Sequence, residues 1–298
     1  MIGIDSFTPF YSVDLKRDRA AELARHKAFR MIEADLVDRD GFAAALAGAG
    51  IARVLHVAAQ PSVRYSITHP DTYARANLTA FLNMLEYCRH AGGIEHMVYA
   101  SSSSVYGGNT TLPFRESDAV DRPISLYAAT KRANELMAYS YAHLYRMKLT
   151  GLRFFTVYGP WGRPDMAVWK FAEAILAGRP IEVFNHGRMR RDFTYVDDIV
   201  AGTLAALDAP PSDKDAVPHR LYNIGNHRAE ELMHLIALLE ESLGRKADCK
   251  FLPMQPGDVP ETFADIEAIR RDHGFEPRTP LDVGIPIFAR WFLDRYGA

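Results

Sequence analysis

Cysteine is scarce in this chain of 298 residues, and long apolar runs are missing from it. The two cysteines, Cys88 and Cys249, lie far apart without metal-ligand spacing, which argues against a disulfide framework or a cysteine metal site. No apolar run approaches the roughly 20 residues that cross a bilayer, and no basic region followed by an apolar segment opens the chain. These absences predict a cytoplasmic protein in a reducing environment.

An excess of charge of one sign is also lacking. The formal net charge is -2 and the basic residues are spread along the chain, so binding to nucleic acid or to a membrane surface is not expected. The composition, 48% hydrophobic and 24% charged, is that of an ordinary globular protein. A small molecule is therefore the expected partner.

Short apolar segments alternate with helical patterns in the first half of the chain. Strands are expected at 1–4, 29–32, 53–59, 96–100 and 149–155, and helices at 14–26, 39–49, 70–91 and 126–145. This alternation predicts an α/β fold with a doubly wound parallel sheet. Prolines and glycines break the rhythm after Gly159. We expect a first domain at 1–158, to which part of 192–228 returns, and a smaller mixed lobe at 159–298.

Tyr127 and Lys131 stand four positions apart in a predicted helix, so both side chains lie on one face. An ammonium beside a phenol favours the phenolate and lowers the pKa of the phenol from about 10, which would make Tyr127 a plausible general base. The pair alone is weak evidence, because this spacing arises by chance in many helices.

Four serines, Ser101 to Ser104, follow the apolar segment 96–100. They should therefore lie at the carboxyl end of a strand, which is where ligands bind in open α/β sheets. A hydroxyl there can bind a substrate oxygen beside the phenolate. The alternative is that the serines only form a polar exit from the strand.

Four motifs occur in the order typical of one enzyme family. They are Ser-Ser-Ser-Ser-Val-Tyr-Gly at 101–107, Tyr127-x-x-x-Lys131, Leu-Arg-Phe-Phe-Thr-Val-Tyr-Gly-Pro at 152–160 and Arg-Asp-Phe-Thr-Tyr-Val-Asp-Asp at 191–198. With them the chain resembles the extended short-chain dehydrogenases, an NAD-dependent epimerase/dehydratase family that acts on nucleotide sugars. Segments 9–17, 58–66 and 159–166 are most similar to its UDP-glucuronate 4-epimerases. The resemblance implies a Rossmann-like fold, NAD as cofactor and a UDP-sugar as substrate.

The resemblance also implies roles for individual residues at the reaction centre. Tyr127 is the implied catalytic base, Lys131 its pKa-lowering and ribose-binding partner, Ser102 the serine of the triad and Ser104 a second hydroxyl facing the sugar. Further NAD contacts are implied for Asp5, Asp35, Leu36, Ala58, Ala59, Asn77 and Phe154. On the residues alone, Asp5 could equally be a turn aspartate.

The implied substrate contacts lie mostly in the second half of the chain. They are Ser103, Thr156, Arg163, Arg191 and Asp258. Arg191 matches an arginine that binds the diphosphate. The guanidinium of Arg163 would offer two parallel N–H donors to a uronate carboxylate. On the sequence alone, Arg163 could equally be a solvated loop charge.

The activity implied is epimerisation at C4 of UDP-glucuronate, giving UDP-galacturonate through a 4-keto intermediate. Related dehydratases and decarboxylases carry carboxylates where this chain has Ser103 and Ser104, which favours simple removal and return of hydride. The alternatives are a UDP-glucose/galactose 4-epimerase or another nucleotide-sugar epimerase, and a truncated, non-catalytic nucleotide-sugar binding protein. The family also implies a homodimer, formed through the helices that contain Tyr127 and follow Asn77.

The glycine-rich N-terminal segment of the family has no counterpart in this sequence. The chain begins where the family's second strand would begin, without the Gly-x-x-Gly-x-x-Gly turn that lets the backbone approach the pyrophosphate. Two explanations stay open: the natural protein has residues upstream of Met1, or the chain is a truncation that retains NAD poorly. The missing strand would lie centrally in the sheet, so we expect exposed strand edges and apolar faces beside its place.

Overall fold

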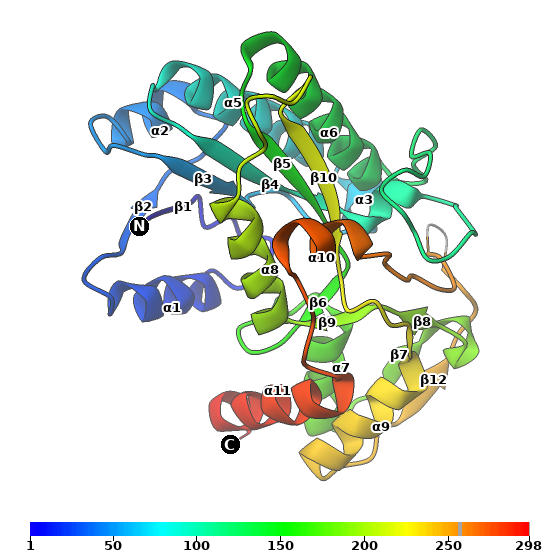
Figure 1. Ribbon diagram of the computed structural model, residues 1–298. Helices are drawn as coiled ribbons and strands as arrows, with labels where there is room; N and C mark the ends of the chain where they lie inside the picture. Colours follow the sequence, from blue (N-terminus) through cyan, green and yellow to red (C-terminus); the bar gives the residue numbers. More distant parts are fainter. Residues whose placement is uncertain (256–257, 298) are drawn as a thin grey trace. The chain divides into compact units, whose positions relative to one another are not determined.

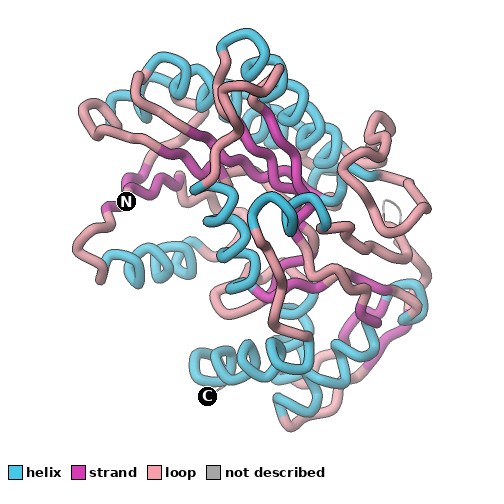
Figure 2. The backbone as a smooth tube through the Cα atoms, viewed as in Figure 1, coloured by secondary structure: helices cyan, strands magenta, loops and turns pink. Residues whose placement is uncertain are grey.

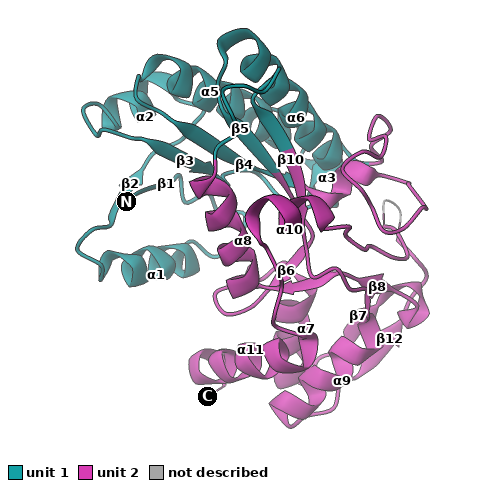
Figure 3. Ribbon diagram, in the orientation of Figure 1, with its two compact units in different colours: residues 1–101, 125–151, 210–220 teal, residues 102–124, 152–209, 221–298 magenta. Residues whose placement is uncertain are grey.

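The computed structural model describes residues 1–255 and 258–297, which form two compact units. The first comprises 1–101, 125–151 and 210–220, and the second 102–124, 152–209 and 221–298 (Figure 3). The division differs from the expected boundary at 158, because 102–124 and 152–158 group with the second unit. Segment 210–220, part of the stretch expected to return, belongs to the first. That the first part of the chain binds the cofactor and the second the substrate stays a prediction.

The first unit has an α/β architecture, as predicted (Figure 1). Its strands are β1 (Ile2–Asp5), β2 (Arg30–Glu33), β3 (Arg53–His56), β4 (His96–Ser102), which ends at the unit boundary, and β5 (Leu149–Phe154) and β10 (His219–Ile224), which cross it. Its helices are α1 (Val13–Ala24), α2 (Arg39–Ala45), α3 (Tyr65–Thr68), α4 (Pro70–Tyr73), the π-helix η1 (Ala74–Thr79), α5 (Ala80–His90) and α6 (Leu126–Tyr145).

The strands form two separate sheets. β1 and β2 pair in parallel, and β10, β5, β4 and β3 follow one another in the second sheet, in which β3 and β4 run parallel. Within the described residues no strand pairs with the outer edge of β3, and Leu55 and Val57 beside it are 40% and 58% exposed. The expected exposure at the place of the missing strand is confirmed.

Helix α6 illustrates how the sequence produces these elements. The Ser125 hydroxyl accepts from the amide of Ala128 at 3.1 Å and caps the first turn, and left-handed Arg146 follows the last. Ala128, Ala138 and Ala142 are fully buried, so small side chains allow close packing of the helix. Residues 97–99 of β4 are buried as well, as expected for a central strand.

The strands that lie wholly in the second unit are only two or three residues long. Figure 2 shows the strands, helices and loops along the whole chain. The strands of the second unit are β6 (Thr156–Tyr158), β7 (Ile181–Val183), β8 (Arg190–Arg191), β9 (Phe193–Tyr195), β11 (Glu230–Glu231) and β12 (Cys249–Phe251), and they pair as β6–β9, β7–β12 and β8–β11. Its helices are the 3₁₀ turns η2 (Ser103–Tyr106) and η3 (Phe184–Gly187), with α7 (Ala167–Leu176), α8 (Val196–Asp208), α9 (Leu232–Leu243), α10 (Glu267–His273) and α11 (Leu281–Tyr296). No described helix is long and apolar enough to cross a membrane.

Candidate active site

Lys131 is buried at the end of β4. Only 4% of the residue is exposed, and its Nζ donates to the carbonyl oxygen of Ala100 at 2.7 Å. Tyr127 lies one turn earlier on α6 and is half-buried, and its ring forms a T-shaped pair with that of Tyr73, with centroids 6.2 Å apart. The predicted Tyr-x-x-x-Lys pair therefore stands on a capped helix, with its lysine anchored to the strand that carries the serine run.

Burial lowers the pKa of Lys131 to about 8, and the charge of Glu135 opposes part of this shift. His56 on β3 is also buried, and burial together with the Lys131 charge lowers its pKa to about 3. His56 is therefore neutral near pH 7, and the Lys131 ammonium is the charged member of this pair.

Asn77 ties three segments of the first unit together. Its side-chain oxygen accepts from the amide of Gln60 at 2.7 Å, and its Nδ2 donates to the Gln60 carbonyl at 3.1 Å and to the Thr130 hydroxyl at 3.0 Å. Asn77 is 2% exposed and lies in the π-helix η1, a type of helix that is frequent at functional sites. These bonds fix the segment containing Ala58 and Ala59 relative to α6.

Two exposed carboxylates follow the parallel strands β1 and β2. Asp5 ends β1 and accepts from the amide of Phe7 at 2.7 Å, and Asp35 accepts from the amide of Val37 at 3.0 Å. Leu36 is buried and its carbonyl accepts from Asn83 at 2.9 Å. Each carboxylate has a second oxygen that can accept from a ribose hydroxyl. The turn role of Asp5 is compatible with this binding role.

The serine run lies in the second unit from Ser102 onward. The Ser102 hydroxyl donates to the Ser104 hydroxyl at 3.2 Å and accepts from the Ser104 amide at 3.2 Å. The structure therefore brings together the two hydroxyls implied in catalysis. Ser103 lies between them, and Phe154 and Thr156 flank the bend between β5 and β6; all three are partly exposed.

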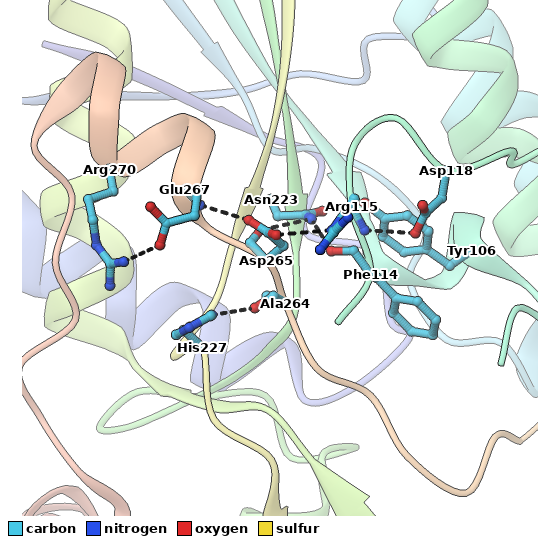
Figure 4. Close-up of polar contacts among 10 residues, drawn as sticks. All are labelled: Tyr106, Phe114, Arg115, Asp118, Asn223, His227, Ala264, Asp265, Glu267 and Arg270. Carbon is cyan, nitrogen blue, oxygen red and sulfur yellow. Dashed lines mark hydrogen bonds and ion pairs between the residues drawn. The ribbon is translucent and has the colours of Figure 1, made fainter. Parts of the chain in front are cut away.

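A buried amide holds the turn that follows the serines (Figure 4). The Tyr106 hydroxyl donates to the side-chain oxygen of Asn223 at 2.6 Å, and its ring stacks on Phe114 with centroids 4.6 Å apart. Asn223 Nδ2 donates to the carbonyls of Phe114 at 2.8 Å and Asp265 at 3.0 Å. Gly107, which follows Tyr106, has a φ of +59°, and a Cβ there would lie 2.5 Å from the Arg122 carbonyl oxygen. The geometry of the serine turn thus depends on partners distant in the sequence.

Arg191 and Asp192 stand side by side in the second unit with different surroundings. Arg191 donates to the carbonyls of Arg190 and Pro260 at 2.9 and 3.1 Å, and burial lowers its pKa against the opposing charge of Asp258. Asp192 is fully buried, and burial raises its pKa to about 6 although it accepts from the amides of Asn226 and Ala264 at 2.6 and 3.1 Å. Asp258 is described, whereas residues 256–257 of its motif lie outside the described residues.

Arg163 makes a two-pronged ion pair within its own loop. Its Nε and Nη2 each lie 2.9 Å from an oxygen of Asp165. The guanidinium therefore already presents its fork to a carboxylate. A bound uronate would use the remaining donors or replace Asp165.

Sequence reasoning did not single out several residues that shape the site. The charges of Glu135 and Lys131 interact, buried His56 lies near Lys131, Thr130 accepts from Asn77, and Asn223 supports the serine turn. The spacing of Lys131 and Glu135, four positions on one helix, was a signal that could have identified Glu135. Asn223 carries no such signal, because it lies 117 residues from Tyr106.

Known proteins resemble the chain over nearly its whole length. A model of the NAD dependent epimerase/dehydratase family matches residues 10–225. A probable UDP-glucuronate 4-epimerase of Rhizobium meliloti is 44% identical, with 99% of this chain and 90% of that protein covered. The crystal structure of UDP-glucuronic acid 4-epimerase from Bacillus cereus, in complex with UDP-glucuronic acid and NAD, aligns with a TM-score of 0.90 at 31% identity, covering 99% and 91% of the two chains. UDP-glucose 4-epimerase of Thermotoga maritima, with UDP-glucose, aligns with a TM-score of 0.86 at 26% identity, covering 98% and 90%.

Proposed function

Because the chain belongs to the NAD dependent epimerase/dehydratase family, we propose that it inverts C4 of UDP-glucuronate to give UDP-galacturonate. The observation that carries the proposal is the buried Lys131 ammonium, held at the end of β4 one helical turn after Tyr127. It provides a fixed positive charge beside the expected phenolate. The resemblance to the family implies the roles of catalytic base and of its pKa-lowering partner for these two residues.

Tyr127 is the proton acceptor and donor in this proposal. As the C4–H bond breaks, the phenolate removes the proton of the 4-hydroxyl, and a 4-keto sugar results. Lys131 stabilises the phenolate electrostatically, and Ser102 and Ser104 offer hydroxyl donors to the sugar oxygen. After the keto sugar turns, hydride is returned to its opposite face and Tyr127 gives the proton back. NAD, when bound, supplies the acceptor and donor of that hydride, so no net oxidation occurs.

The described residues fit NAD at its two ends. Asp5 and Asp35 offer carboxylate oxygens for the adenosine half, and Lys131 with the segment fixed by Asn77 suits the nicotinamide half. Between these ends, no described strand fills the place beside β3, and the sequence contains no Gly-x-x-Gly-x-x-Gly turn for the pyrophosphate.

The proposal is tested by incubating the chain with saturating NAD and UDP-glucuronate and following UDP-galacturonate by anion-exchange chromatography. We expect an equilibrium mixture of the two uronates and no stoichiometric NADH. Calorimetry with NAD and with UDP-sugars accompanies the assay. Binding of UDP-sugar without binding of NAD, and without turnover, would identify a non-catalytic binding protein instead.

Arg163→Leu is expected to raise the KM for UDP-glucuronate by roughly 10- to 100-fold, because a charge-assisted hydrogen bond contributes about 1.5–3 kcal/mol. Turnover of UDP-glucose, which has no carboxylate, should change little. Steady-state kinetics with both substrates measure the effect. Asp165→Asn is the matched control: it removes the internal competitor for the guanidinium, so the KM for UDP-glucuronate should stay level or fall. An unchanged KM in Arg163→Leu would contradict carboxylate recognition by this residue.

A homodimer through α5 and α6 is a further part of the proposal. Leu136, Tyr139 and Leu144 on α6 are 55%, 52% and 62% exposed, and Leu82 on α5 is 40% exposed. Exposed apolar side chains of this size on neighbouring helices favour association. Leu136→Glu is expected to shift the sedimentation coefficient to that of a monomer, whereas Leu204→Glu, on α8, should not. A dimer that persists in Leu136→Glu would exclude this face.

The cytoplasm remains the proposed location. Cys88 and Cys249 are both free, which suits a reducing compartment.

A further inference from the structure

Glu135 is a buried carboxylate that the mechanism above does not use. Its side chain is 0% exposed, and it lies one turn beyond Lys131 on α6. The Ser101 hydroxyl donates to Oε1 at 2.6 Å, and Arg132 Nη1 donates to Oε2 at 2.9 Å. Both oxygens accept, as they do in an ionised carboxylate.

Glu135 and Lys131 bind neighbouring residues of β4. Ser101 follows Ala100, whose carbonyl accepts from the Lys131 amine. Glu135 and Lys131 thus hold two consecutive residues of β4 against one face of α6. A shift of Glu135 would displace the carbonyl on which the Lys131 amine is anchored.

The charges around Lys131 come from several elements. His56 on β3 is neutral, Tyr127 stands on the same helix, and Arg132 on α6 is partly exposed, with 28% of its side chain accessible. Burial alone would favour the uncharged amine, and Glu135 provides the opposing negative charge.

We propose that Glu135 is a positioning residue for Lys131: its buried carboxylate fixes the end of β4 against α6 and keeps the Lys131 amine protonated while the reaction runs. That Glu135 fixes the end of β4 against α6 concerns the fold alone. That it keeps the Lys131 amine protonated during the reaction rests on the proposed function.

The test is a titration of Lys131 in the full chain without ligands, so that it does not depend on any activity. Lysine is labelled with ¹³C at Cε, and the Lys131 signal is assigned by its disappearance in Lys131→Arg. We expect a midpoint near pH 8 in the natural chain. In Glu135→Gln the midpoint should fall by about one pH unit or more, because an opposing charge is lost. Ser101→Ala keeps the carboxylate and should move the midpoint much less.

Arg132→Gln keeps the proposal testable if Glu135→Gln fails to fold. It removes the cation that compensates Glu135, so the Lys131 midpoint should rise. An unchanged midpoint in folded Glu135→Gln, or a lowered one in Arg132→Gln, would overturn the proposal.

Kinetics then separate this inference from the proposed function. The alkaline limb of the kcat profile should move to lower pH in Glu135→Gln by the same amount as the Lys131 midpoint, with little change in the KM for UDP-glucuronate. A loss of kcat that is uniform with pH, accompanied by an unmoved midpoint, would mark a merely structural residue. If the natural chain shows no epimerisation, the titration still decides the role of Glu135.

Discussion

Tyr127→Phe is expected to lower kcat for UDP-glucuronate by about 10²- to 10⁴-fold, the range that a positioned acid–base group contributes. The phenol oxygen is the group that takes the 4-hydroxyl proton, and phenylalanine keeps the ring that meets Tyr73. Binding of UDP-glucuronate should therefore change little, and the free energy of unfolding should fall by about 1 kcal/mol at most. Single-turnover kinetics and calorimetry measure the two effects.

Tyr139→Phe is the matched control for this variant. Tyr139 lies on the same helix and is 52% exposed. It lies on the proposed dimer face, where phenylalanine keeps the apolar ring, and it belongs to no proposed catalytic or ligand-binding site. The same atom is removed there, so its activity should equal that of the natural chain. If Tyr127→Phe turned over UDP-glucuronate as fast as the natural chain, Tyr127 would have no part in the chemistry, whatever the control shows.

Lys131→Met should separate activity from stability. We expect kcat at pH 7 to fall by at least about 10²-fold, since the phenolate loses the positive charge that stabilises it and the cofactor ribose loses a donor. The methionine side chain is similar in length to that of lysine and is favourable in an apolar environment. The carbonyl of Ala100 loses its donor, which limits any gain in stability.

A pH dependence of unfolding is expected in the natural chain, because the pKa of Lys131 is lowered in the folded state. Between pH 8 and 10.5 the folded protein has released the Lys131 proton while the unfolded chain still holds it. The free energy of unfolding therefore rises with pH across this window, by up to about 3 kcal/mol from this group.

Chemical denaturation at several pH values should show this rise in the natural chain and its loss in Lys131→Met. Lys170→Met, at an exposed lysine, is the control and should retain both the activity and the rise. The same pH dependence in Lys131→Met and in the natural chain would show that Lys131 is not the group responsible.

Local sequence patterns were sufficient to predict the elements that carry the proposed reaction centre. Helix α6 spans the predicted residues 126–145, because its serine cap and apolar face are encoded nearby. The strands β3 and β4 lie within or close to their predicted ranges for the same reason. The open edge of β3 was also predictable, because one strand of a recognisable pattern was missing.

Other features depend on contacts between distant residues, and the sequence gives no periodicity for them. The helix expected at 70–91 contains the π-helix η1, which places Asn77 against Gln60 and Thr130. The serine turn depends on Asn223, far along the chain. The unit boundaries differ from the expected one because the segment after Ser101 packs with the second half of the chain.

The central claim is that hydride leaves C4 and returns to C4 of the same sugar while Tyr127 moves the proton. UDP-glucuronate carrying deuterium at C4 tests this most directly, with the product analysed by NMR and mass spectrometry. The account predicts UDP-galacturonate that retains the deuterium at C4, with no NADH accumulating. Loss of the label to water, or formation of the product at the same rate in Tyr127→Phe, would contradict it.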